Sequence, residues 1–231
     1  MVAPRQGRSC GKGDILAKRA LIEHRPWLLA SLAASIAFYF VTGSALGEFW
    51  QILLKGAGVG FLAVYAWQRT SGIDGAILTL ALALSAAADM TLELAFDVGG
   101  ALFAASHAVA VVLYLRNRRD RTSPSQMMLS LVLLLATPTV SYLLSGRIDI
   151  AVYALFLAVM AAAAWSSRFP RYRVGAGAVL FVISDWLIFS RMGSFDLGAL
   201  PDYLIWPLYY SGQFMIATGV VQTLRGENAA R

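Results

Sequence analysis

The chain has 231 residues, of which 58% are hydrophobic and only 14% are charged, and its mean hydropathy is +0.65. Soluble globular chains have about 45–50% apolar and about 25% charged residues, so this composition excludes an ordinary soluble domain. One cysteine, Cys10, and two histidines, His24 and His107, exclude an internal disulfide, a thiolate zinc cluster and a histidine-rich metal site. We therefore expect no bound metal.

Long apolar blocks predict an all-α polytopic membrane protein with eight transmembrane helices. Crossing the hydrocarbon core takes about 20 residues of helix, whereas barrel strands would be shorter and alternate in polarity. The predicted spans are residues 27–46, 49–67, 73–92, 98–115, 127–144, 148–165, 174–191 and 203–224. The predicted organisation is a basic segment 1–26, a transmembrane domain 27–224 and a tail 225–231. The connections are short, so any function must lie within the bundle.

The distribution of basic residues predicts the orientation. Cytoplasmic loops retain Lys and Arg, and with the N-terminus inside, all nineteen basic residues except Arg147, Arg191 and Lys55 lie in the cytoplasm. Both termini are therefore predicted to be cytoplasmic. The net charge of +6 is explained by this asymmetry and by attraction to anionic lipid, and we expect no nucleic-acid partner.

Polar residues inside the predicted spans mark the candidate site. A charge near the bilayer centre costs about 2.5–3.5 kcal/mol on insertion scales, so each such residue needs a reason. With a rise of about 1.5 Å per residue, these residues fall in one layer between the midplane and the outer half, which predicts a shared polar cavity. They are Lys55, Asp89, His107, Asp185, Tyr209, Tyr210 and Gln213.

Each of these residues also has a purely structural interpretation. Asp185 would form an ion pair between helices, and Asp89 with Glu93 at i+4 would form an interfacial acidic cluster. Lys55 would neutralise an aspartate or extend to the interface. His107 would be a packing histidine, and the polar stripe of the last span would be packing as well.

Two further patterns concern helix packing. Gly56 and Gly60 have the spacing of a small-xxx-small helix contact, and the surrounding glycines lack the context of a phosphate-binding loop. Pro138 and Pro207 lie inside predicted spans, where proline frees a backbone carbonyl of the preceding turn.

Several segments stand out together by their order and spacing. They are Leu54 with Lys55, Ser85 to Asp89, Ser106 with His107 and on to Tyr114, Val182 to Leu187, and Tyr209 to Gln213. This set resembles the YhhN family of membrane lysoplasmalogenases, which are eight-helix membrane proteins. The chain departs at Gly56 and Ala88, where the family usually has Pro and Gly. The resemblance implies an integral protein of the bacterial inner membrane, with a lysophospholipid substrate and surrounding membrane lipids as partners. It does not predict an oligomeric state.

The resemblance also implies an activity, the hydrolysis of the vinyl ether bond of lysoplasmalogen to a fatty aldehyde and glycerophosphoethanolamine or glycerophosphocholine. This chemistry requires no metal or cofactor. It needs one carboxylic acid that stays protonated near neutral pH and one carboxylate, as in glycoside hydrolysis. We expect Asp185 to be the general acid and Asp89, placed nearer water, to be the carboxylate, although the roles can be exchanged. The expected supporting roles are a hydrogen bond from His107 to one carboxyl, a charge from Lys55 on the other carboxyl or on phosphate, and positioning of water or glycerol by Tyr209 and Gln213.

Three other functions remain open from the sequence. A proton-coupled transporter of a small molecule or lipid would use the same buried Asp, His and Lys. An aspartyl intramembrane protease also has two membrane aspartates, but its motifs differ from Ala88-Asp89 and Ser184-Asp185. A non-catalytic lipid-binding or scaffold protein would not need two buried acids.

Overall fold

The computed structural model describes residues 25–42, 44 and 47–230 of the chain. Cys10, His24 and nearly all of the predicted basic segment lie outside the described residues. Within them the chain forms eight α-helices, with a short π-helix η1 preceding α8. Their bounds are α2 Arg25–Val41, α3 Glu48–Arg69, α4 Gly72–Leu92, α5 Phe96–Arg116, α6 Pro124–Ser145, α7 Ile148–Ser166, η1 Arg171–Gly175, α8 Ala176–Ser190 and α9 Leu200–Ala230.

Each predicted span corresponds to one helix, and the all-α prediction is confirmed for the described residues. Six segments are long and apolar enough to cross a membrane, namely α3 to α7 and the continuous η1–α8 segment. The apolar part of α2 is shorter, at Pro26–Val41, and α9 is a longer helix of 31 residues that includes charged residues at both ends. The protein is therefore a multi-pass membrane protein, while the count of eight crossings and the cytoplasmic placement of the termini stay predictions.

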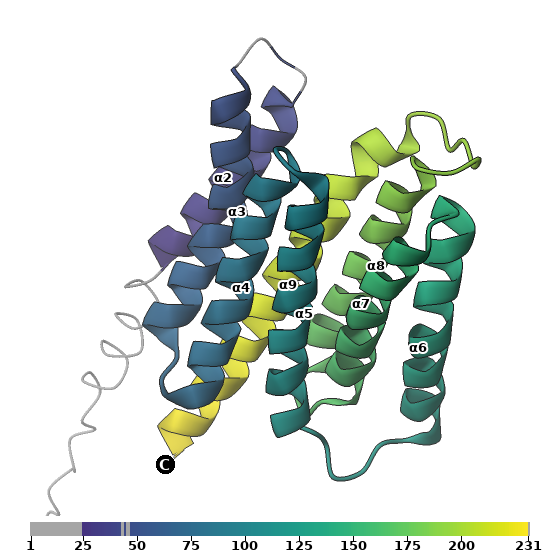
Figure 1. Cartoon of the computed structure of the whole chain (residues 1–231). Helices are drawn as coiled ribbons and strands as arrows, with labels where there is room; N and C mark the ends of the chain where they lie inside the picture. The colour runs from purple at the N-terminus through teal and green to yellow at the C-terminus, as the bar shows by residue number, and fades with distance from the viewer. Residues whose placement is uncertain (1–24, 43, 45–46, 231) are drawn as a thin grey trace, which may run out of the picture.

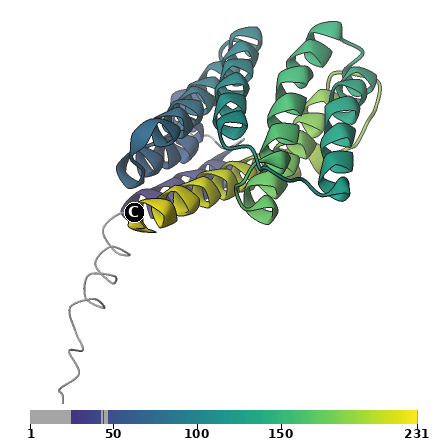
Figure 2. The same ribbon diagram turned by 90° about the horizontal axis from the view of Figure 1, so that it is seen from below.

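The helices form two groups joined by α9 and by one helix contact. Figure 2 shows α2 to α5 on one side and α6 to α8 on the other, with α9 running alongside. Helix α9 packs against α2, α3, α4 and α8, and α5 packs against α4 and α7. Residues far apart in sequence on α4, α5, α7, α8 and α9 therefore meet in the interior (Figure 1).

Hydrogen bonds and an ion pair connect two loops at the lower end of the bundle in Figure 1, the α5–α6 and α7–α8 connections, to the end of α9. The Arg168 Nε donates to Asn117 Oδ1 at 2.7 Å, and the Arg168 backbone N–H donates to the Asn117 carbonyl at 2.8 Å. The Arg168 guanidinium also pairs with Glu227. These bonds hold the α5–α6 connection, the α7–α8 connection and α9 together.

Small residues set the closest helix approaches. An added Cβ at Gly177 would lie 2.7 Å from the Gly212 carbonyl, so only glycine allows α8 and α9 to approach this closely. Gly56 and Gly60 both face α4 near Ala86, which confirms the predicted small-xxx-small contact. These approaches fix α4, α8 and α9, the helices that carry Asp89, Asp185 and Tyr209.

Both prolines predicted inside spans lie inside helices, Pro138 in α6 and Pro207 in α9. Pro207 has no N–H for the carbonyl of Tyr203, one turn earlier. That carbonyl accepts a hydrogen bond from the Tyr39 hydroxyl at 3.5 Å. The carbonyl freed by the proline therefore binds α2.

Candidate functional site

The structure brings both predicted aspartates together, each hydrogen-bonded to a tyrosine. Asp89 of α4 is 2% exposed and accepts a hydrogen bond on Oδ2 from the Tyr209 hydroxyl of α9 at 2.7 Å. Asp185 of α8 is 5% exposed and accepts on Oδ2 from the Tyr153 hydroxyl of α7 at 2.8 Å. His107 contacts Tyr153 and packs against Phe181, and Phe181 packs against Tyr209, so shared aromatic rings connect the two Asp–Tyr pairs. Two equivalent Asp–Tyr pairs thus come from four different helices.

A chain of hydrogen bonds lies beside the Asp89 pair. Gln213 Nε2 of α9 donates to Ser85 Oγ of α4 at 3.1 Å, and Ser85 Oγ is 2.8 Å from Ser106 Oγ of α5. Ser106 donates to the Ala81 carbonyl at 2.8 Å, so Ser85 is the donor to Ser106. The chain satisfies these buried polar groups and fixes the relative positions of α4, α5 and α9.

His107 reaches the second aspartate through Tyr153. Its Nε2 is 3.2 Å from the Tyr153 hydroxyl, which in turn donates to Asp185. Because the phenol uses its only proton on Asp185, the hydrogen bond assigns the His107 proton to Nε2. The prediction of a direct hydrogen bond from His107 to a carboxyl is therefore wrong, since Tyr153 of α7 lies between His107 and Asp185.

Aromatic rings surround the two phenols. The Phe181 ring is 5.0 Å from the Tyr209 ring and 5.0 Å from the His107 ring, edge to face in both cases. The Phe103 ring lies edge-on to Tyr209 at 5.8 Å and to Phe181 at 5.9 Å. These contacts hold the phenols in place and surround the hydrogen-bonded pairs with apolar surface.

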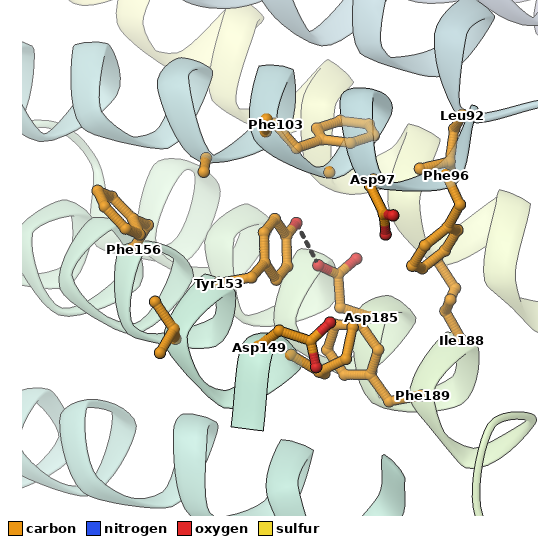
Figure 3. A pocket seen from close by; sticks show the side chains of 15 residues that line it. Leu92, Phe96, Asp97, Phe103, Asp149, Tyr153, Phe156, Asp185, Ile188 and Phe189 are labelled. Carbon is orange, nitrogen blue, oxygen red and sulfur yellow. Dashed lines mark hydrogen bonds between the residues drawn. The ribbon is translucent and has the colours of Figure 1, made fainter. Parts of the chain in front are cut away.

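A cavity of about 370 Å³ adjoins the Asp185 pair, between α5, α7 and α8. Figure 3 shows the Asp185 carboxyl and the Tyr153 hydroxyl at its wall, with Asp97 and Asp149 nearby. The other labelled lining residues are apolar, including Phe96, Phe103, Phe156, Ile188 and Phe189. The cavity therefore offers apolar walls, one enclosed carboxyl and two carboxylates that are exposed.

The position of Asp89 corrects one prediction. We expected Asp89 to be nearer water than Asp185, but Asp89 is enclosed and does not line this cavity, whereas Asp185 does. Depth along a helix can be counted from sequence, but exposure depends on which helix face meets a neighbour. The Asp89 face of α4 is covered by Tyr209 of α9.

Lys55 and Tyr210 also differ from expectation. The Lys55 ammonium pairs directly with Glu93 at the end of α4, so the expected ion pair with an aspartate is not formed. The Tyr210 hydroxyl lies 2.7 Å from Ser31 Oγ of α2. It points away from the carboxyls because successive residues on a helix are about 100° apart.

Sequence reasoning missed Tyr153, which contacts both His107 and Asp185. The available signal was its position in an otherwise apolar helix, four residues after Asp149 and so on the same face. Of the seven predicted residues, Asp89, Asp185, His107, Tyr209 and Gln213 belong to the buried polar cluster. In the described part of the chain, no three His, Cys, Asp or Glu side chains come together as a metal site.

Comparison with known families identifies the family of this chain. The model of the YhhN family matches residues 50–220, which include every predicted site residue. The chain belongs to the YhhN family. Searches of the curated proteins and of the solved structures gave no match.

Proposed function

We propose that this YhhN protein hydrolyses the vinyl ether bond of lysoplasmalogens, releasing a fatty aldehyde and glycerophosphoethanolamine or glycerophosphocholine. The observation that carries the proposal is the enclosed carboxyl of Asp185 in the wall of an apolar cavity, with the Asp89–Tyr209 pair connected to it through the rings of Phe181 and His107. A vinyl ether needs an acid and a stabilising negative charge, and two carboxyls in different environments supply both.

The reaction begins with proton transfer from Asp185 to the outer alkene carbon. This forms an oxocarbenium ion next to the Asp185 carboxylate, and the nearby charge of Asp89 adds electrostatic stabilisation. Water then attacks the carbon bound to oxygen and gives its proton to Asp185, which restores the acid. The resulting hemiacetal collapses to the aldehyde and the free hydroxyl of the glycerol.

The two phenols position the carboxyls for these steps. Tyr153 and Tyr209 each hold Oδ2 of one aspartate, which leaves the Oδ1 of Asp185 to face the substrate. His107 holds the Tyr153 hydroxyl in turn. Tyr153, Tyr209 and His107 are therefore positioning residues for the two acids.

The cavity also suits a lipid with one apolar chain and a zwitterionic headgroup. The aromatic and aliphatic walls would take the first part of the alkenyl chain. Asp97 and Asp149 are exposed carboxylates at the same cavity and would attract the headgroup amine, while Arg147, paired with Asp149, would face the phosphate.

The test uses purified full-length protein in detergent with lysoplasmenylethanolamine, and it follows release of fatty aldehyde. The matched control substrate is the ester lysophosphatidylethanolamine of the same chain length. We expect aldehyde from the vinyl ether only, with turnover lost in Asp185→Asn and in Asp89→Asn. No release by monodisperse wild-type protein would refute the hydrolase, and proton-dependent uptake into proteoliposomes would then support the transporter.

A further inference from the structure

A second cavity lies at the opposite end of the α5–α7 helix pair. We call it the basic-end groove, and it is lined by residues that include Arg118, Thr122, Met127, Leu131, Val159 and Ser166. Its volume is about 420 Å³, within the range of about 300–1,000 Å³ that is typical of ligand sites. The candidate active site uses the first half of α7, whereas this groove uses the second half.

The packing of α6 explains why the groove exists. Helices α5 and α6, both fully described, each pack against α7 but not closely against each other. Figure 2 shows α6 set apart from α5, with the connection 117–123 running between them. Because α5, α6 and α7 are all candidate membrane spans, we expect the opening between α5 and α6 to face the hydrocarbon of the bilayer.

The charges at the groove favour an anion. Two neighbouring arginines are already neutralised, Arg116 by Asp74 and Arg168 by Glu227. Arg118 lines the groove and makes no ion pair with any described residue. The described lining residues include no Asp or Glu, so the groove carries a net positive charge at its end and apolar side chains along its length.

We propose that the basic-end groove binds one anionic phospholipid, with the phosphate at Arg118 and an acyl chain between α5 and α6. Arg118 lies two residues after Arg116, the last residue of α5, and we expect the end of a transmembrane helix to lie near the lipid phosphates. The partly exposed Leu131 and Val159 side chains lie on the membrane-spanning part of the groove and would contact the chain. The bound lipid would fill the space between α5 and α6.

Native mass spectrometry of the full chain in detergent tests this site, with phosphatidylglycerol and phosphatidylcholine of identical acyl chains as probes. Wild type should bind one phosphatidylglycerol about fivefold more tightly than phosphatidylcholine, which corresponds to about 1 kcal/mol for one basic residue near an anionic headgroup. Arg118→Gln should abolish this preference. Arg121→Gln, which changes an arginine of the same connection that does not line the groove, should keep it.

A second pair of variants tests the acyl-chain part of the groove. Val159→Trp fills the groove and should remove the tightly bound lipid, whereas Leu155→Trp, one turn away on the exposed face of α7 and outside the groove, should not. Equal binding of the two lipids by wild type would overturn the proposal. Retention of the preference in Arg118→Gln would also overturn it, and so would unchanged binding in Val159→Trp, which would indicate a headgroup-only contact.

Discussion

Two tyrosines orient the carboxyls of the two acids. Tyr153 and Tyr209 come from different helices, and each donates its only proton to Oδ2 of one aspartate. A phenol in this role orients the carboxyl without adding charge. The His107 contact and the surrounding rings then hold the Tyr153 hydroxyl in one place.

Tyr153→Phe should lower kcat while leaving the fold intact. The ring packing against Phe189 is retained, but the hydrogen bond to Asp185 is lost. Asp185 becomes a carboxylate as its proton leaves, and hydrogen bonds to charged groups contribute about 1.5–3 kcal/mol, so we expect a loss of about 10- to 100-fold. Aldehyde release measures the rate, with Tyr142→Phe on the exposed side of α6 as control. An unchanged kcat would show that Tyr153 does not position Asp185 for catalysis.

The adjacent tyrosines of α9 offer a matched pair. Tyr209→Phe should lower kcat by about 10- to 100-fold, because Asp89 loses its partner. Tyr210→Phe removes only the contact with Ser31, so it should cost about 1 kcal/mol of stability and leave kcat near wild type. Steady-state kinetics and thermal unfolding of both variants check this. Equal loss of kcat in both would contradict the assignment.

At the residue scale, the sequence identified the acids better than their partners. Asp89 and Asp185 stood out because a charge inside a membrane span is costly, and the structure places them together. An uncharged tyrosine can lie in a membrane span without this free-energy cost, so little in the sequence indicated that Tyr153 belongs to the site. We expected Lys55 and Tyr210 in the cluster because the depth of a residue along its helix can be counted from the sequence. The direction in which a side chain points around the helix axis depends on helix packing, and these two side chains contact Glu93 and Ser31 instead.

At the element scale, the helices were predictable because each span must satisfy its backbone hydrogen bonds internally. The bounds of α3 to α7 lie within a few residues of the predicted spans. The largest differences are at α2, which ends at Val41, and at α9, which extends over Leu200–Ala230. Hydropathy does not report where a helix continues beyond the membrane, so the ends of α9 could not be predicted.

The α8–α9 contact leaves no room for a side chain at Gly212. In Gly212→Ala the added Cβ would lie 2.6 Å from the Gly177 carbonyl, which would push α8 and α9 apart. Overpacking of this kind costs about 1–3 kcal/mol, and kcat should also fall because Asp185 and Tyr209 lie on these two helices. Gly226→Ala, with nothing within 4 Å of its Cβ, is the control. Thermal unfolding in detergent compares them, and equal stability would contradict a tight contact.

At the scale of the whole molecule, the distribution of basic residues predicts the orientation in the membrane but not which helices pack together. The loops at the lower end in Figure 1 carry the Arg116–Arg121 and Arg168–Arg173 clusters. The candidate active site lies toward the other end, near the start of α5 and of α7. Which helices are neighbours could not be predicted, because apolar surface in a bilayer does not select a partner and small-residue contacts such as Gly177 with Gly212 decide it.

The orientation itself can be tested by cysteine labelling in a Cys10→Ser background. Positive charge retained in the cytoplasm predicts that Ser194→Cys, in the α8–α9 connection, reacts with an impermeant maleimide in intact cells. Thr122→Cys, in the α5–α6 connection, should react only after permeabilisation. The reverse pattern would place the candidate active site toward the cytoplasm.

The most direct test of the central claim is the reaction in D₂O, with the aldehyde reduced at once to the alcohol and analysed by mass spectrometry. Protonation of the outer alkene carbon by Asp185 must place one solvent deuterium on the carbon next to the aldehyde group. We predict one deuterium at that position with wild type, and no product with Asp185→Asn. Aldehyde without deuterium there, or full activity of Asp185→Asn, would contradict proton transfer from Asp185 to the vinyl ether.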